Sequence, residues 1–191
     1  MSSIAGHAAA GITVYLSSRG HGRAPSKPAL GLSVFLATCP DLDYLAVWLF
    51  GYSANPRFTH SLLFALAITT LVRVGLNRYK EFHLPVTALA AASLSHPLLD
   101  LLVGAHPVPL LWPLSIEVSI PFGVLPSAGS LDPTNRYLWR NLLIELGVLL
   151  PVFAVWIVVA RGNACRKTLA SGILVAPIWL LFVAWSVGLS R

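Results

Sequence analysis

The sequence predicts an all-α fold, a polytopic membrane helix bundle of about five or six helices with an irregular, proline-rich cap on its non-cytoplasmic side. Its residues are 56% hydrophobic and only 10% charged, whereas about a quarter of the residues of a soluble domain are charged. Apolar runs of membrane-spanning length alternate with short basic loops. These observations predict a multi-pass protein of the cell inner or plasma membrane, with residues 1–191 in a single integral membrane domain.

Six apolar segments are the expected helices, and two of them carry features that affect packing. The first contains Gly6, Ala10 and Thr13 at helical spacing, a pattern that favours close contact with a neighbouring helix. The second is broken at Pro40, because proline lacks an N–H donor and disfavours helix at the residue before it. In a membrane such a break must face protein or a wet cavity. The predicted helices cover approximately residues 3–17, 28–50, 60–76, 85–103, 137–160 and 168–189.

The segment 104–135 is expected to form the cap. It contains six prolines and no lysine or arginine, which indicates irregular structure rather than a membrane span. Residues 116–120 alternate between apolar and polar side chains like a short strand. The prediction therefore allows for a short β-hairpin within the cap.

Basic residues mark one end of the predicted bundle. The loops 17–27, 73–80 and 161–167 each carry three Lys or Arg, and alternate crossings place all three loops on one side. By the positive-inside rule this side is cytoplasmic. The net charge of +6 is therefore interpreted as a topology signal, and no nucleic-acid partner is expected. The opposite end receives the cap together with Asp41, Asp43, His60, His96, Asp100 and, if the first helix starts outside, His7.

His96 and Asp100 lie four residues apart in an apolar run, which places them on one helical face. An ionised side chain at the bilayer centre costs at least about 2.5 kcal/mol, so something must offset the burial of this pair. We expect a metal ion, and the alternative is a His–Asp hydrogen-bonded pair with a packing role. Because Pro97 disfavours helix at His96, Ser95 or His96 could instead cap a helix that begins at Pro97.

Asp41 and Asp43 form a second acidic pair, two residues apart and next to Pro40. On a helix their side chains would point about 200 degrees apart, so one regular element cannot aim both at one ion. The broken backbone could do so. The sequence leaves open which aspartate is the ligand and which one caps the restarted helix.

Two lone histidines are further candidate ligands. His60 lies between Thr59 and Ser61, whose hydroxyls could cap a helix or orient a ligand. His7 interrupts the first apolar segment. Both are stronger candidates because other ionisable residues are predicted at the same end of the bundle.

Glu145 and His106 complete the candidate residues. Glu145 could be a further ligand or a general base, or it could pair with Arg140 or Arg57. His106 begins the cap and is a candidate for contact with substrate.

The histidines and aspartates form a mixed nitrogen and oxygen donor set, which suits Zn²⁺, Mn²⁺ or Fe²⁺ better than Ca²⁺. We expect one or two divalent ions, with Zn²⁺ as the first choice. A bound ion of this kind can lower the pKa of a water ligand towards neutrality and polarise a phosphoryl or acyl oxygen. The expected chemistry is therefore hydrolysis.

Five motifs occur in order within roughly residues 1–120: Gly6-His7 with Gly11, Pro40-Asp41-Leu42-Asp43, Arg57-Phe58-Thr59-His60-Ser61, Ser95-His96-Pro97-Leu98-Leu99-Asp100, and the sequence VPLLWPLS at 108–115. In this order they resemble the YdjM-like family of predicted membrane-bound metal-dependent hydrolases. The resemblance implies an integral membrane protein whose metal site is built from these histidines and aspartates. The family's usual His-Arg before Thr-His-Ser is Pro56-Arg57 here, and the retained Arg57 is expected to bind phosphate.

The ligand order is also similar, more loosely, to that of the zinc-dependent phospholipase C and P1-type nucleases, which are all-helical. Their ligands likewise run His, Asp, His and then His-x-x-x-Asp. Those enzymes add another His pair and a His-x-x-x-Glu, where this chain offers only Asn141 and Glu145. One or two metal ions therefore fit this chain better than three.

The sequence predicts a membrane-embedded hydrolase in which metal-activated water cleaves an ester or phosphodiester bond of a lipid-like substrate. The alternative is a non-enzymatic membrane protein, a metal or proton carrier or an assembly partner, that uses the same residues. The predicted metal ligands are His7, Asp41, Asp43, His60, His96 and Asp100. The candidate catalytic carboxylates are Asp41, Asp43 and Glu145, and the candidate substrate-binding residues are Arg57, Thr59, Ser61 and His106. Membrane lipid is the expected environment and a possible substrate, and the oligomeric state is left open.

Overall fold

The computed structural model describes residues 2–20, 24–52, 56–77, 84–104, 106–121, 123–127, 132–162 and 166–189. In this part of the chain the regular secondary structure is helical, which confirms the predicted all-α class. The elements in chain order are α1 (Ile4–Ser18), α2 (Lys27–Thr38), the short 3-10 helix η1 (Cys39–Leu42), α3 (Asp43–Phe50), the 3-10 helix η2 (Phe58–His60), α4 (Leu62–Leu76), α5 (Val86–Val103), α6 (Arg136–Ala160) and α7 (Arg166–Val187).

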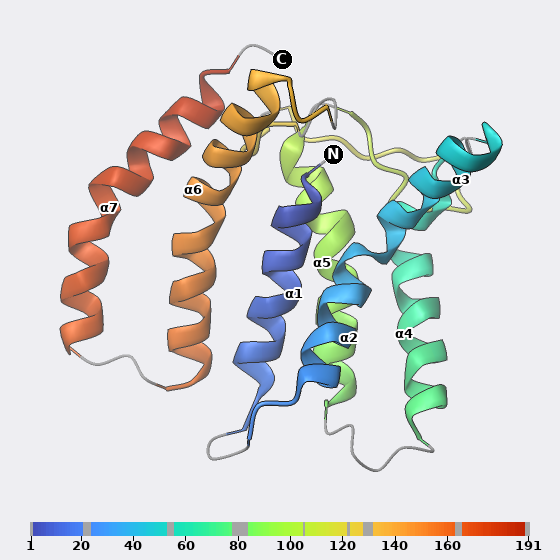
Figure 1. Ribbon diagram of the computed structural model, residues 1–191, viewed down its shortest axis with the longest axis horizontal. Helices are drawn as coiled ribbons and strands as arrows, with labels where there is room; N and C mark the ends of the chain where they lie inside the picture. The colour runs from blue at the N-terminus through green and yellow to red at the C-terminus, as the bar shows by residue number, and fades with distance from the viewer. Residues whose placement is uncertain are drawn as a thin grey trace.

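The helices form a bundle in which α1 has a central place. It packs against α2, α5 and α6, while α4 packs against α5 and α7 against α6 (Figure 1). The expected small-residue face of α1 is buried, because Gly6, Ala10 and Thr13 are all covered by neighbouring elements. At Gly11 the approach to α2 is closest, since a Cβ there would lie 2.7 Å from the carbonyl oxygen of Ser33.

The second apolar segment is divided as the position of Pro40 predicts. The α-helix α2 ends at Thr38, η1 carries Pro40, and a new α-helix begins at Asp43. Figure 1 shows α3 turned away from the line of α2. This break brings the Asp41 region to the end of the bundle where α1 begins and α5 ends.

Helix α5 does not restart at Pro97, so the prediction that Ser95 or His96 could cap a new helix is wrong. The helix is continuous from Val86 to Val103 with Pro97 inside it. Instead of capping, the Ser95 hydroxyl donates a hydrogen bond to the carbonyl of Ala92 at 2.7 Å. Neighbouring helices and local hydroxyls let a membrane helix tolerate the missing proline donor.

The irregular chain after α5 is fastened to the ends of two helices. Leu62 at the start of α4 donates a backbone hydrogen bond to Leu110 at 3.0 Å, and Val124 donates to Leu102 of α5 at 2.7 Å. Within the described residues of this segment, one isolated antiparallel bridge pairs Val108 with Val118. A single bridge is not the β-hairpin for which the sequence allowed, because the prolines around it leave few N–H donors for a ladder.

Some of the helical segments have the length and the apolar outer surface of membrane spans. Among the described residues, three are long and apolar enough to cross a bilayer, Lys27–Val47, Val86–Val103 and Arg136–Ala160. Large apolar side chains such as Trp156 of α6 and Leu181 of α7 are exposed. The end of α1, the start of α2 and the end of α6 lie together at one end of the bundle (Figure 1). Arg19, Lys27 and Arg161 at these helix ends agree with the predicted basic side.

Replacement of Gly11 by alanine is expected to destabilise the protein by about 1–3 kcal/mol, because the added methyl group meets backbone atoms of α2 that cannot rotate away. Gly31 and Gly75, which also lie in helices, have open space at the Cβ position. Alanine at these two positions should be neutral or slightly stabilising. Thermal unfolding of the detergent-purified variants measures the difference, and equal melting temperatures for all three would contradict the close contact.

Candidate metal centre

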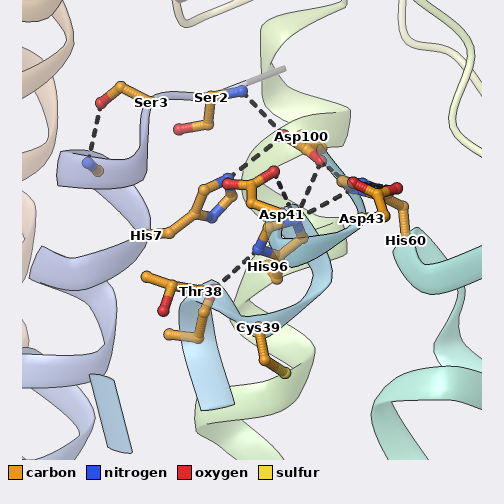
Figure 2. Close-up of polar contacts among 12 residues, drawn as sticks. Ser2, Ser3, His7, Thr38, Cys39, Asp41, Asp43, His60, His96 and Asp100 are labelled. Carbon is orange, nitrogen blue, oxygen red and sulfur yellow. Dashed lines mark hydrogen bonds and ion pairs between the residues drawn. The ribbon is translucent and has the colours of Figure 1, made fainter. Parts of the chain in front are cut away.

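Three histidines and two aspartates from four separate elements meet inside one end of the bundle. Figure 2 shows them with their acid groups and ring nitrogens turned towards one another. All five are buried, with exposed fractions between 0% and 9%. They are His7 of α1, Asp41 of η1, His60 of η2, and His96 and Asp100 of α5.

Local sequence signals explain how each element brings its residue there. Ser3 caps α1 by accepting a hydrogen bond from the Gly6 amide at 3.0 Å, which places His7 in the first turns of the helix. Ser61 caps α4 in the same way, by accepting from the Phe64 amide at 3.1 Å. His60 is thereby fixed in the turn that precedes α4.

The spacing of the donor atoms fits a small divalent ion. Two ligand atoms that each lie about 2.1 Å from one ion cannot be more than about 4.2 Å apart. His7 Nε2 lies 3.5 Å from Asp100 Oδ1 and 4.0 Å from Asp41 Oδ2. His96 Nε2 lies 3.4 Å from Asp100 Oδ2 and 3.8 Å from Asp41 Oδ1. Each of these four separations is short enough to be bridged by one ion.

The orientation of the His96 ring is set by the break in the second apolar segment. Its Nδ1 lies 2.8 Å from the carbonyl oxygen of Ala37, in the last turn of α2. Because a carbonyl only accepts, Nδ1 carries the proton, and the lone pair of Nε2 faces the acids and His60 Nδ1, which lies 3.1 Å away and is itself 2.8 Å from Asp100 Oδ2. A ligand histidine is commonly oriented in this way by a carbonyl on its other nitrogen.

His7 and His60 have nitrogens that nothing in the described chain satisfies. Both ring nitrogens of His7 and Nε2 of His60 are buried without a hydrogen-bond partner among the described residues. An unsatisfied buried polar group costs about 1–3 kcal/mol, and such exceptions need a specific reason. His7 stacks on His96 with 3.8 Å between ring centroids, so the two rings face the same acids. Unpaired nitrogens next to buried carboxylates are a donor set that fits a divalent cation.

Asp43 lies beside this cluster, with its Oδ2 3.6 Å from His60 Nε2, but its hydrogen bonds come from residues outside the cluster. It forms a two-pronged ion pair with Arg57, in which Nη2 and, at 2.8 Å, Nε donate to the carboxylate. Thr59 also donates to Asp43 Oδ2, at 3.0 Å, and the Arg57 guanidinium lies 4.3 Å from the ring centre of Tyr44. Burial alone would lower the pKa of Arg57, but the hydrogen bond and the charge of Asp43 raise it above its ordinary value. The two aspartates thus differ in their partners, because Asp41 faces His7 and His96 whereas Asp43 pairs with Arg57.

Glu145 does not pair with Arg140 or Arg57, contrary to one of the sequence alternatives. It is only 1% exposed and accepts hydrogen bonds from the Ser2 hydroxyl and, at 3.0 Å, from the Ser3 amide. Arg140 instead donates to the side-chain oxygen of Asn141. No pattern in the sequence indicated Ser2 or Ser3 as partners, because they lie more than 140 residues away.

A pocket of about 360 Å³ opens beside the cluster. His60 and Asp100 line it from the cluster side, and Arg57 and His106 also line it. Ser61 is fully buried as a helix cap, and Thr59 is bonded to Asp43, so neither of these two predicted substrate contacts is among the lining residues. Sequence reasoning missed Tyr44 and Glu117, which also line the pocket. The remaining histidines, His21 and His83, lie outside the described residues.

Comparison with known proteins gives a family for the whole bundle. The model of the family described as YdjM inner membrane protein matches residues 1–187. The chain belongs to the YdjM inner membrane protein family. No curated protein and no solved structure matches, so the looser likeness to phospholipase C and P1-type nucleases gains no support. Membership confirms the resemblance, extends it beyond residue 120, and identifies an inner membrane protein.

The two aspartates near Pro40 are expected to differ in their effect on metal content. Asp41→Asn should lower the metal bound per protein, because Asp41 faces the nitrogens of both His7 and His96. Asp43→Asn should keep the metal, because the Asp43 carboxylate pairs with Arg57 and accepts a hydrogen bond from Thr59. Elemental analysis of the purified variants decides the question, with the exposed His106→Ala as a control. Loss of metal from Asp43→Asn alone would reverse the assignment.

Proposed function

We propose that this YdjM-family protein is a membrane-embedded metal-dependent hydrolase that cleaves a phosphate ester of a lipid or lipid-like substrate. The observation that carries this proposal is the buried cluster of His and Asp, whose donor atoms are spaced for a divalent ion and which borders a pocket lined by Arg57. Buried ionisable residues in a membrane protein mark functional sites.

The ligands would come from both metal-capable groups of the cluster. One group consists of His7, Asp41 and His96, and the other of His60, His96 and Asp100. The shared His96 is compatible with one ion or with two. Zn²⁺ fits this donor set first, and Mn²⁺ or Fe²⁺ are the alternatives. When bound, the ion supplies Lewis acidity that activates water and polarises the ester.

Arg57 is the residue that binds the phosphate group in this proposal. Its planar guanidinium matches phosphate oxygens, and it is held rigidly by Asp43 and by the face of Tyr44. Asp43 therefore acts by fixing Arg57 rather than by taking a proton, because both of its oxygens already accept hydrogen bonds. A positioned cation at the reacting phosphate stabilises the charge that develops there.

Asp41 is the carboxylate that remains available among the three catalytic candidates. Glu145 is occupied by Ser2 and Ser3. Asp41, in contrast, faces the ring nitrogens of His7 and His96. It can hold the ion or accept a proton from water, and Glu145 takes neither role in the proposal.

Lipid is the proposed substrate because of where the pocket lies. The start of α1 and the end of α5, which carry cluster residues, lie at the end of the bundle opposite the basic helix ends (Figure 1), and we place the pocket near the headgroups of the leaflet on that side. By the positive-inside rule that leaflet is the non-cytoplasmic one of a multi-pass protein. A volume of about 360 Å³ accommodates a headgroup and leaves the acyl chains in the surrounding bilayer.

The alternative of a metal or proton carrier has less support in the packing. A carrier needs polar groups that continue from the cluster towards the basic end. Between α1, α2 and α5 that region is instead filled by an apolar core that includes Leu36, Leu89 and Ala92. Between α4 and α5, the Thr69 hydroxyl donates a hydrogen bond to the Ser93 hydroxyl at 2.9 Å, a polar contact without an ionisable group. A site with access from one side fits hydrolysis better.

Purified protein in mixed micelles is expected to release a water-soluble, phosphate-containing headgroup from labelled phospholipid, and a chelator should stop the release. Arg57→Gln should retain the metal and lower kcat/KM by about 10- to 100-fold, because one fixed cation at the phosphate is lost. The exposed Arg136→Gln is the matched control. If metal-loaded wild-type protein releases no headgroup from any phospholipid class, the hydrolase proposal fails.

A further inference from the structure

Helix α6 provides no ligand to the His/Asp cluster, yet it buries an acid next to it. Glu145 is 1% exposed and has no cationic partner among the described residues. A buried carboxylate without compensating donors would be strongly destabilising. Its donors come from the residues that precede α1, so Glu145 ties α6 to the N-terminal end of α1.

The residues that Glu145 holds are the ones that lead directly to the cluster. The Ser3 amide donates to both carboxylate oxygens of Glu145, at 3.0 and 3.2 Å. The Ser3 carbonyl then accepts the backbone hydrogen bond of His7 at 3.0 Å. Ser2 completes the link, because its hydroxyl donates to Glu145 and its amide donates to Asp100 Oδ1 at 2.8 Å. Figure 2 shows Ser2 next to Asp100 and Ser3 above His7.

The close approach of α1 to Glu145 depends on a glycine. A Cβ at Gly6 would collide with the Glu145 carboxylate oxygen Oε1 and would come within 2.9 Å of Ser2 Oγ. The carboxylate also lies at the N-terminus of α1, where unpaired amides and the helix dipole favour a negative charge. Both helices therefore contribute to the contact: α1 through Gly6 and its N-terminal amides, and α6 through Glu145.

His7 needs such a contact more than His96 does. The His96 ring is oriented by a hydrogen bond to the Ala37 carbonyl. The His7 ring has no hydrogen-bond partner on either nitrogen among the described residues, so its place depends on the α1 backbone and on stacking against His96. Whatever fixes the first turn of α1 thus fixes His7.

We infer that Glu145 is a positioning residue of the metal centre: through Ser2 and Ser3 it holds the first turn of α1 so that His7 faces the ion. This inference rests on the proposed function in so far as it assumes the metal centre, but it does not depend on which ester is cleaved. Residues that orient metal ligands typically contribute about 10- to 100-fold in affinity.

Zinc binding to the purified full-length protein, measured by competition with a chromophoric chelator, tests the inference. Glu145→Gln should bind the same number of zinc ions as wild type with about 10- to 100-fold lower affinity. The double variant Glu145→Gln/His7→Ala should bind no more weakly than His7→Ala alone, because both changes act on the same ligand. Asp132→Asn, an exposed acid-to-amide change, and Ile144→Val, a buried neighbour on α6, are the controls and should bind like wild type.

Three results would overturn the inference. If Glu145→Gln binds fewer zinc ions, Glu145 is itself a ligand. If its zinc affinity is unchanged, Glu145 has no role at the centre. If the losses in the double variant are additive, Glu145 acts on a residue other than His7. If Glu145→Gln cannot be purified, Ser2→Ala removes one donor to the same carboxylate and should weaken zinc binding in the same non-additive way with His7→Ala. If zinc binding follows these expectations but wild-type protein hydrolyses no substrate, the hydrolase proposal is rejected and the inference still holds.

Discussion

The break in the second apolar segment is the constraint on which the rest of the site depends. Because Pro40 ends α2, the carbonyl of Ala37 is free to accept from His96, and that bond turns the other nitrogen of the ring towards the acids. The same break carries Asp41 into the cluster and starts a new helix at Asp43, which holds Arg57. One proline thus sets the place of one candidate ligand, the orientation of a second and the position of the cation that lines the pocket.

Charge balance explains why these polar residues gather instead of dispersing. Asp41 and Asp100 are buried and face histidines, whereas the nearest arginine, Arg57, is neutralised by Asp43. Two buried carboxylates without a cation would be costly in an apolar interior. A divalent ion among these residues would offset both charges and bind the lone pair of His7 Nε2, which faces both aspartates. A bound cation would thus lower the free-energy cost of burying the two carboxylates.

Local patterns in the sequence predicted the helical class, the break at Pro40 and the common end of the bundle for His7, His60, His96 and Asp100. These features follow from hydropathy, proline chemistry and loop charge, which act over a few residues or over whole helices. The roles of individual acids depend on tertiary contacts that such patterns do not contain. Asp41 and Asp43 are distinguished only by what the folded chain places opposite them. The partners of Glu145 lie at the other end of the sequence, and the continuous helix through Pro97 depends on its neighbours.

The division of the candidate centre among α1, η1, η2 and α5 would couple metal binding to the folding of the bundle. No short segment contains a complete donor set, since even the His96 and Asp100 pair supplies two donors only. In the unfolded chain the donors are therefore dispersed, and the free energy of metal binding would contribute to the stability of the native packing. The precision of the site then depends on the first turns of α1, which carry His7. Helix α5 is embedded between its neighbours, whereas α1 brings His7 to the centre from its first turns, where helices fray. Glu145 of α6 holds these turns in place through its hydrogen bonds with Ser2 and Ser3.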